Sequence, residues 1–135
     1  MVKRGDIWLV NLDPTVGSEI QKTRPCVVIS PAELHDHLRT AIVAPMTSQG
    51  FAAPFRVPVT HAGTQGLIVL DQMRTVDKLR LAKKLGAVSA KTLSATLAAL
   101  QEIFEECSKL IGCRTSMTIQ SIQSKLDCAL RAISL

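Results

Sequence analysis

The first half of the chain alternates short apolar runs with turn-forming residues, a pattern typical of short β-strands separated by loops. We expect strands over residues 7–12, 26–29, 41–46 and 55–59, a longer strand or hairpin arm over 66–77, and one more strand over 79–85. Residues 15–23 are polar and lack apolar periodicity, which indicates a loop. Ser30 and Pro31 match a helix cap and a first helical residue, so a short helix is expected after them.

The spacing of the apolar residues changes at Ser89, which can cap a helix. Beyond it, apolar residues recur at steps of four, three and four, at Leu93, Leu97, Leu100 and Phe104. This stripe predicts an amphipathic helix that lies on a sheet and ends near Gly112, and a second such helix is predicted over residues 115–135. Short strands followed by helices predict an α+β fold that is mainly β: a small, strongly curved sheet or barrel with helices at one side.

Length and composition are those of one folded domain, because the chain has 135 residues of which 47% are hydrophobic and 20% charged. No uninterrupted apolar run exceeds four residues, whereas a transmembrane helix needs about 20. The basic N-terminus is not followed by an apolar stretch long enough for a signal peptide. We therefore expect a cytoplasmic protein without a membrane partner.

The net charge of +5 favours a polyanionic partner. Residues 1–86 hold eleven Lys and Arg against seven Asp and Glu, so most of the excess lies there. Cysteines stand at positions 26, 107, 113 and 128 without zinc-ligand spacing, and Cys26 lies in an apolar run that predicts a buried core residue. The His35-Asp36-His37 triplet is expected to be solvated, with a metal or acid–base role as the less favoured alternative. We expect no metal and no cofactor.

Three segments in this order carry a resemblance. The first is Gly5–Val10 with Asp13-Pro14 and Gly17-Ser18-Glu19, the second is Lys22–Ser30 (KTRPCVVIS), and the third is Val43–Ser48 with Leu70–Val76 downstream. Together they resemble the MazF/PemK family of toxins from type II toxin–antitoxin systems, over about residues 5–104. This divides the chain into a toxin domain over residues 1–105 and a C-terminal extension over 106–135, expected to be helical and of unknown role.

The resemblance implies a dimeric SH3-like β-barrel with a C-terminal amphipathic helix. It also implies a sequence-specific, metal-independent endoribonuclease that cleaves single-stranded RNA and is restrained by a cognate antitoxin. The neighbouring 2′-hydroxyl attacks, and the products carry a 2′,3′-cyclic phosphate and a 5′-hydroxyl. Arg24 and Thr47 match the catalytic positions of the family, and Glu19, Ser48 and Gln72 match positions beside the substrate groove.

The chemistry of each side chain limits the roles that it can have in such a site. A guanidinium has a pKa above about 12, so Arg24 is better suited to stabilise charge on the phosphate than to accept a proton. For Thr47 simple turn chemistry stays open, and for Glu19 a solvated position. Asp71 lies in an apolar stretch and would need a partner, so an ion pair with Arg24 or Arg74 and a substrate contact are equally open. Phe51 and Phe55 are the candidates for base stacking, with core packing as the alternative.

Two alternatives remain at the level of function. A toxin of the same fold can act without catalysis on a protein target such as gyrase, or serve as a binding module, because one fold hosts several activities. For the extension, the options are a helix packed on the barrel or on a dimer partner, a decayed end of the reading frame, or a helix that covers the antitoxin groove.

Overall fold

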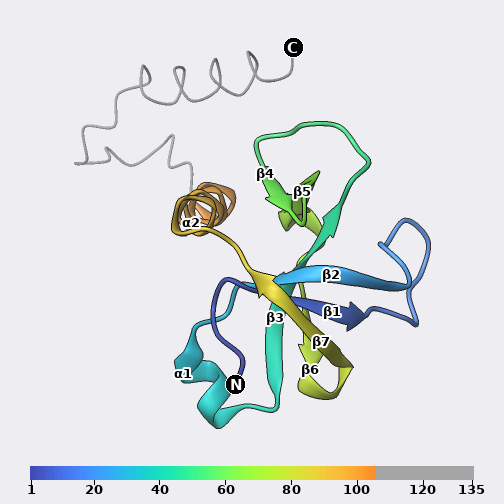
Figure 1. Ribbon diagram of the computed structural model, residues 1–135, viewed down its shortest axis with the longest axis vertical. Coiled ribbons are helices and arrows are strands. Elements are labelled where there is room, and N and C mark those ends of the chain that lie inside the picture. The colour runs from blue at the N-terminus through green and yellow to red at the C-terminus, as the bar shows by residue number, and fades with distance from the viewer. Residues whose placement is uncertain (106–135) are drawn as a thin grey trace, which may run out of the picture.

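The computed structural model describes residues 1–105, and the predicted helix over 115–135 lies outside them (Figure 1). The elements are β1 (Asp6–Asn11), β2 (Thr23–Val28), α1 (Ala32–His37), β3 (Thr40–Thr47), β4 (Arg56–His61), β5 (Thr64–Val69), the 3-10 turn η1 (Leu70–Gln72), β6 (Arg74–Asp77), the 3-10 turn η2 (Lys78–Arg80), β7 (Leu81–Ala87) and α2 (Ala90–Phe104). No helix among the described residues is long and apolar enough to cross a membrane.

The strands form one antiparallel sheet in the order β4-β5-β3-β2-β1-β7, and β6 also pairs with β3. β3 curls this sheet because it changes partner along its length. It pairs with β6 over Thr40–Val43 and with β2 up to Pro45, whereas Met46 and Thr47 pair with β5. This curled sheet with a helix at its C-terminal end confirms the predicted fold, which is mainly β.

The core has two parts on the two faces of the curled sheet. In one part, buried residues such as Ile7, Val27 and Ile68 pack against Leu97 and Leu100 of α2. The other part holds Val10, Leu12, Cys26, Val28, Val43 and Val76. The sheet is therefore covered by α2 on one side, while Cys26 is fully buried on the other, as predicted.

Three local predictions are wrong. The stretch 66–77 is not one strand, because η1 breaks it between β5 and β6. The helix after Ser89 starts as predicted, with the Ser89 side chain accepting from Thr92 N–H, but it ends at Phe104 well before Gly112. Phe104 is 68% exposed, so the apolar stripe covers the sheet only as far as Leu100.

The corner at α1 also differs from the prediction. Pro31 is the N-cap of α1 and the Ser30 side chain makes no cap bond. Ser30 Oγ instead accepts from Ile42 N–H at 3.0 Å and lies 2.6 Å from His35 Nε2, while His35 Nδ1 lies 3.0 Å from Val2 O. His35 is thus buried and fully bonded, not solvated. Because a carbonyl can only accept, Nδ1 donates to Val2 O, which leaves Nε2 to accept from the Ser30 hydroxyl.

Candidate active site

A hollow of about 430 Å³ opens where η1 meets the loop between β1 and β2. We call it the η1 groove, and its lining residues are Leu12, Glu19, Ile20, Pro45, Asp71, Gln72, Met73 and Arg74. They come from three segments far apart in the sequence. Two of the five residues predicted as site residues, Glu19 and Gln72, therefore meet in one groove.

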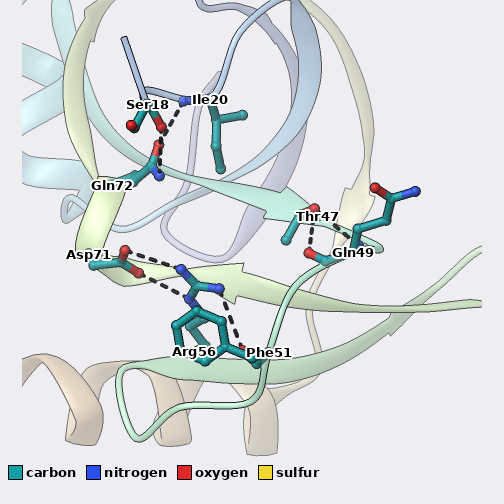
Figure 2. Close-up of polar contacts among 8 residues, drawn as sticks. All are labelled: Ser18, Ile20, Thr47, Gln49, Phe51, Arg56, Asp71 and Gln72. Atoms are coloured by element: carbon teal, nitrogen blue, oxygen red, sulfur yellow. Dashed lines mark hydrogen bonds and ion pairs between the residues drawn. The ribbon is translucent and has the colours of Figure 1, made fainter.

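Gln72 ties the β1–β2 loop to η1. Its Oε1 accepts from Ile20 N–H at 2.7 Å and its Nε2 donates to Ser18 O at 3.4 Å (Figure 2). Glu19 stands between these two attachment points, and one of its carboxylate oxygens accepts from Val16 N–H at 3.2 Å. The Gln72 amide therefore positions the loop that presents the exposed Glu19 carboxylate to the groove.

Arg24 lies near the start of β2 and is half-buried. Within the described part of the chain, its guanidinium makes one hydrogen bond, from Nε to Gln21 O at 3.0 Å. The terminal nitrogens Nη1 and Nη2 are left to bind an anion with the forked geometry that suits phosphate.

A second arginine lies close to Arg24. Arg74 lines the groove and donates from Nη1 to Leu12 O at 3.1 Å. Burial raises the pKa of the Cys26 thiol to about 12, and the charges of Arg74 and Arg24 oppose this rise. Arg74 and Arg24 are therefore both near enough to Cys26 to act on its thiol, and of the two Arg74 lines the groove. Sequence analysis considered Arg74 only as a partner for Asp71.

Thr47 ends β3 where this strand leaves β2. The β2–β3 register ends at Cys26 opposite Pro45, and two further steps along it would bring Arg24 opposite Thr47. The Thr47 hydroxyl donates to Gln49 O at 2.9 Å and accepts from Gln49 N–H at 3.1 Å (Figure 2). The Thr47 side chain thus stabilises the turn after β3, which is one of the two roles that the sequence left open. Its hydroxyl must break the hydrogen bond to Gln49 O before it can donate to a substrate.

Ser48 lies elsewhere. It lines a second hollow of about 760 Å³ between α2 and the β4–β5 hairpin, together with residues such as Val57, Leu67 and Thr92. The structure therefore brings Glu19 and Gln72 into the η1 groove and leaves Ser48 in a separate hollow. Arg24, near the start of β2, and Thr47, at the end of β3, line neither hollow.

Asp71 forms the expected ion pair, but with a different arginine. Arg56 of β4 approaches its carboxylate with Nε at 3.4 Å and Nη2 at 3.5 Å. Arg56 also stacks on Phe51, its guanidinium carbon 4.3 Å from the ring centroid. Phe51 is 65% exposed, so it is not a core residue. Sequence analysis missed Arg56 because nothing local marks a pairing across fifteen residues.

Gly66 of β5 is a further residue that the sequence did not single out. A Cβ at this position would stand 2.8 Å from Thr47 O, which is closer than real Cβ atoms approach. Only glycine lets β5 approach the end of β3 this closely. Gly66 therefore sets where Thr47 lies. Among the described residues there is no group of three or more His, Cys, Asp or Glu side chains that could hold a metal ion.

The described chain is thus a curled antiparallel sheet with a C-terminal helix, and its η1 groove is lined by Arg74, Glu19 and Gln72. The sequence model of the family described as PemK-like, MazF-like toxins of type II toxin–antitoxin systems matches residues 3–104, and the chain belongs to this family. The resemblance that the motifs suggested is confirmed.

Individual relatives agree with this membership. The endoribonuclease PemK of Escherichia coli is 42% identical over 108 residues, which cover 76% of this chain and 81% of PemK. The endoribonuclease EndoA of Bacillus subtilis is 35% identical over 107 residues, covering 75% and 92% of the two chains. The crystal structure of MazF from Deinococcus radiodurans matches with a TM-score of 0.68 at 28% identity, over 76% of this chain and 94% of MazF. The same toxin in a MazE–MazF crystal structure matches with a TM-score of 0.64, also at 28% identity and over the same shares of the two chains.

Proposed function

We propose that this toxin is a sequence-specific, metal-independent endoribonuclease that cleaves single-stranded RNA. The observation that carries the proposal is a groove lined by the Arg74 guanidinium and the Glu19 carboxylate, together with an Arg24 guanidinium whose terminal nitrogens make no hydrogen bond within the described residues. The names of its relatives PemK and EndoA support the same activity. These relatives do not favour the alternative of a non-enzymatic toxin with a protein target such as gyrase.

The reaction uses the ribose 2′-hydroxyl beside the cleaved bond as the nucleophile. The 2′-oxygen forms a bond to phosphorus while the bond from phosphorus to the 5′-oxygen breaks. The leaving 5′-oxygen takes up a proton from solvent water, which yields a 2′,3′-cyclic phosphate and a 5′-hydroxyl. Negative charge grows on the phosphate oxygens in the transition state, and the free Nη1 and Nη2 of Arg24 bind these oxygens. Thr47 adds a hydrogen bond once its hydroxyl turns away from Gln49 O.

The proton of the 2′-hydroxyl needs an acceptor. Arg24 is unsuited because a guanidinium does not lose its proton in the physiological range. The carboxylates that line the groove are Glu19 and Asp71, and Asp71 faces Arg56. Glu19 is therefore the better acceptor, since one of its oxygens bonds a backbone amide while the residue remains exposed. Gln72 supports it by holding the loop, and Ser48 contacts RNA that extends from the groove toward the second hollow.

The proposed partners rest on the net positive charge of the chain and on its membership of the PemK/MazF family. We place the toxin in the cytoplasm as a homodimer, restrained by a cognate antitoxin whose acidic segment covers the arginines of the groove. The MazE–MazF structure of the Deinococcus toxin is the precedent for such a pair. Residues 106–135, which follow the toxin domain, have no part in this proposal.

The test is cleavage of a long single-stranded RNA in EDTA by the antitoxin-free protein. Wild type gives discrete fragments with 5′-hydroxyl ends, and Arg24→Ala lowers the rate at least about 100-fold because the charge on the transition state is no longer met. Arg39→Ala removes an exposed arginine beyond α1 and leaves the rate unchanged. A DNA of the same sequence stays intact because it lacks the nucleophile. Intact RNA from folded wild type would point to a protein target instead.

A further inference from the structure

The loop that joins β3 to β4 carries an exposed aromatic ring. Phe51 is 65% exposed, and one face of its ring is covered by the Arg56 guanidinium, whose carbon lies 4.3 Å from the centroid. Phe55 lies on the same guanidinium at 5.9 Å. A ring that meets a planar cation on one face while most of its surface is exposed has its other face open to solvent.

Besides stacking on the ring, the Arg56 guanidinium makes three polar contacts. Nε and Nη2 face the two carboxylate oxygens of Asp71 at 3.4 and 3.5 Å, and Nη1 donates to Phe51 O at 3.5 Å. Figure 2 shows the guanidinium between the Asp71 carboxylate and Phe51. Arg56 is therefore the link between a residue of the loop and a residue of η1.

Asp71 connects this link to the η1 groove, because it lines the groove itself. Its neighbour Gln72 holds the β1–β2 loop, so the two consecutive residues of η1 fix the loops on both sides (Figure 2). The ring of Phe51 is thus anchored through Arg56 and Asp71 to the groove wall.

Such a ring suits an unpaired nucleobase. Bases of single-stranded RNA stack on aromatic faces, and each such stack strengthens binding by about five- to 150-fold. The chain has few rings to offer, with one Trp, three Phe and no Tyr. Trp8 packs against the core and Phe104 lies on α2, which contributes no residue to the groove lining. Phe55 also lies near the Arg56 guanidinium, but it is half-buried and its centroid is farther away, at 5.9 Å. Phe51 is therefore the exposed ring that Arg56 links to the groove.

We propose that the open face of Phe51 stacks on an unpaired base of the RNA next to the cleaved bond, and that Arg56 and Asp71 position the ring. Phe51 then contributes to the choice of cleavage sequence. This inference rests on the proposed endoribonuclease function. Arg56 and Asp71 are positioning residues, because they act through the ring and leave the phosphate to Arg24.

The Arg56–Asp71 ion pair can position the ring without being essential for folding. The Asp71 side chain is 35% exposed, so solvent screens its ion pair with Arg56 and Asp71→Asn costs little stability. The Arg56 side chain is 13% exposed, and Arg56→Lys keeps a positive charge beside Asp71. The Arg56–Asp71 pair can therefore be altered in a protein that still folds, and the effect on RNA cleavage can be measured.

The first experiment compares steady-state cleavage of a short RNA that contains the preferred site. We expect Phe51→Ala to raise KM about tenfold, with kcat within about twofold of wild type, because a base stack binds substrate without touching the reacting atoms. Phe51→Trp keeps the stack and restores KM. The matched control is Phe104→Ala, which removes a ring that is 68% exposed on α2 and leaves both constants unchanged.

The second experiment tests the positioning pair. Arg56→Lys keeps the charge but loses the planar face and the fork, and Asp71→Asn loses one charge of the pair. Both raise KM in the direction of Phe51→Ala and broaden the set of cleaved sequences when fragment ends from a long RNA are sequenced. A binding measurement complements these kinetics. An RNA with 2′-deoxyribose at the cleaved site binds but is not cleaved, and we expect it to quench the tryptophan fluorescence of F51W more than that of wild type, which has only Trp8.

The outcomes separate this inference from the function on which it rests. If wild type does not cleave RNA, the proposed function fails. If wild type cleaves and Phe51→Ala keeps its KM and its set of cleaved sequences, the function stands and the role of Phe51 is disproved. If Phe51→Ala weakens only the antitoxin complex, the ring is a protein contact and the inference is equally wrong.

Discussion

The molecule has two polar clusters that differ in how completely their groups are bonded. In the Ser30 corner (Val2, Ser30, His35, Ile42 and Lys78) both ring nitrogens of His35 have partners, and Lys78 Nζ donates to His35 O. At the candidate active site, by contrast, the terminal nitrogens of Arg24 make no hydrogen bond within the described residues, and Glu19 of the η1 groove is exposed. A serine–histidine pair looks catalytic in a sequence, yet here it is buried and satisfied.

This difference distinguishes polar residues that stabilise the fold from polar residues that are available to a ligand. Buried groups with complete partners hold segments together, and the corner joins the N-terminus, α1, β3 and η2. Groups with unused hydrogen-bonding capacity at a surface hollow are available to a ligand. The corner should therefore control stability and the groove should control activity, which the following substitutions can test.

The largest effect on activity, after the loss expected for Arg24→Ala, is expected from Glu19→Gln. Removal of the proton acceptor lowers kcat about 100-fold or more, because general base catalysis contributes about this much. The melting temperature stays at the wild-type value, since Glu19 is exposed. Glu33→Gln, at an exposed carboxylate of α1, is the control in the same RNA assay. A kcat of wild-type size in Glu19→Gln would remove Glu19 from the mechanism.

The corresponding test of the corner is Ser30→Ala. It leaves His35 Nε2 and Ile42 N–H without partners inside the protein, so the free energy of unfolding should fall by about 2–4 kcal/mol. Urea denaturation measures this loss, and kcat/KM per folded molecule stays the same. Ser94→Ala on the exposed face of α2 serves as control and costs little. A loss of activity without a loss of stability would break the distinction between the two clusters.

The sequence predicts the strands well where the pattern is local. Short apolar runs mark β1, β2 and β3, and the change of period at Ser89 marks α2 with its cap. The prediction fails at η1, because the apolar pattern continues through Leu70 while the chain turns at Asp71 and Gln72. That turn is held by contacts to Ile20 and Arg56, which no local pattern can reveal.

The site was predictable only in part for the same reason. Arg24, Thr47 and Gln72 follow from the motifs, but their neighbours follow from the fold. The sequence does not show that Arg74 acts beside Arg24, or that Ser48 faces the second hollow. Ser30 satisfies the local rule for a helix cap, yet its hydroxyl is taken by His35, a contact of the folded corner. A local sequence preference, such as that of Ser30 for a helix cap, is overridden where a tertiary contact gives a stronger hydrogen bond.

Gly66 lies where core and groove meet, and its substitution should affect both properties moderately. In Gly66→Ala the Cβ would meet Thr47 O at 2.8 Å, so β5 and the end of β3 must separate. We expect a loss of about 1–3 kcal/mol in unfolding free energy and about a tenfold loss in kcat/KM as Thr47 moves. Gly63→Ala, where no atom lies within 4 Å, tests backbone strain alone at a φ of +76°. It costs some stability and leaves kcat/KM unchanged, whereas equal activity losses in both variants would contradict the role of Gly66.

The smallest effect is expected at Cys26, which lies near Arg24 and Arg74 but belongs to the core. Burial raises the pKa of its thiol from 9.0 to about 12 in the folded protein, so between these values the folded state keeps a proton that the unfolded state loses. Stability therefore falls as pH rises through this range, by about 1 kcal/mol at pH 10. Urea unfolding under reducing conditions at pH 7 and pH 10, for wild type and Cys26→Ala, measures the difference. Cys26→Ala should lose less stability between the two pH values than wild type while its cleavage constants at pH 7 stay unchanged. Equal losses would mean that the thiol ionises as readily in the folded protein as in the unfolded chain. The charges of Arg74 and Arg24 would then have outweighed burial, and Cys26 would have to be counted with the groove and not with the core.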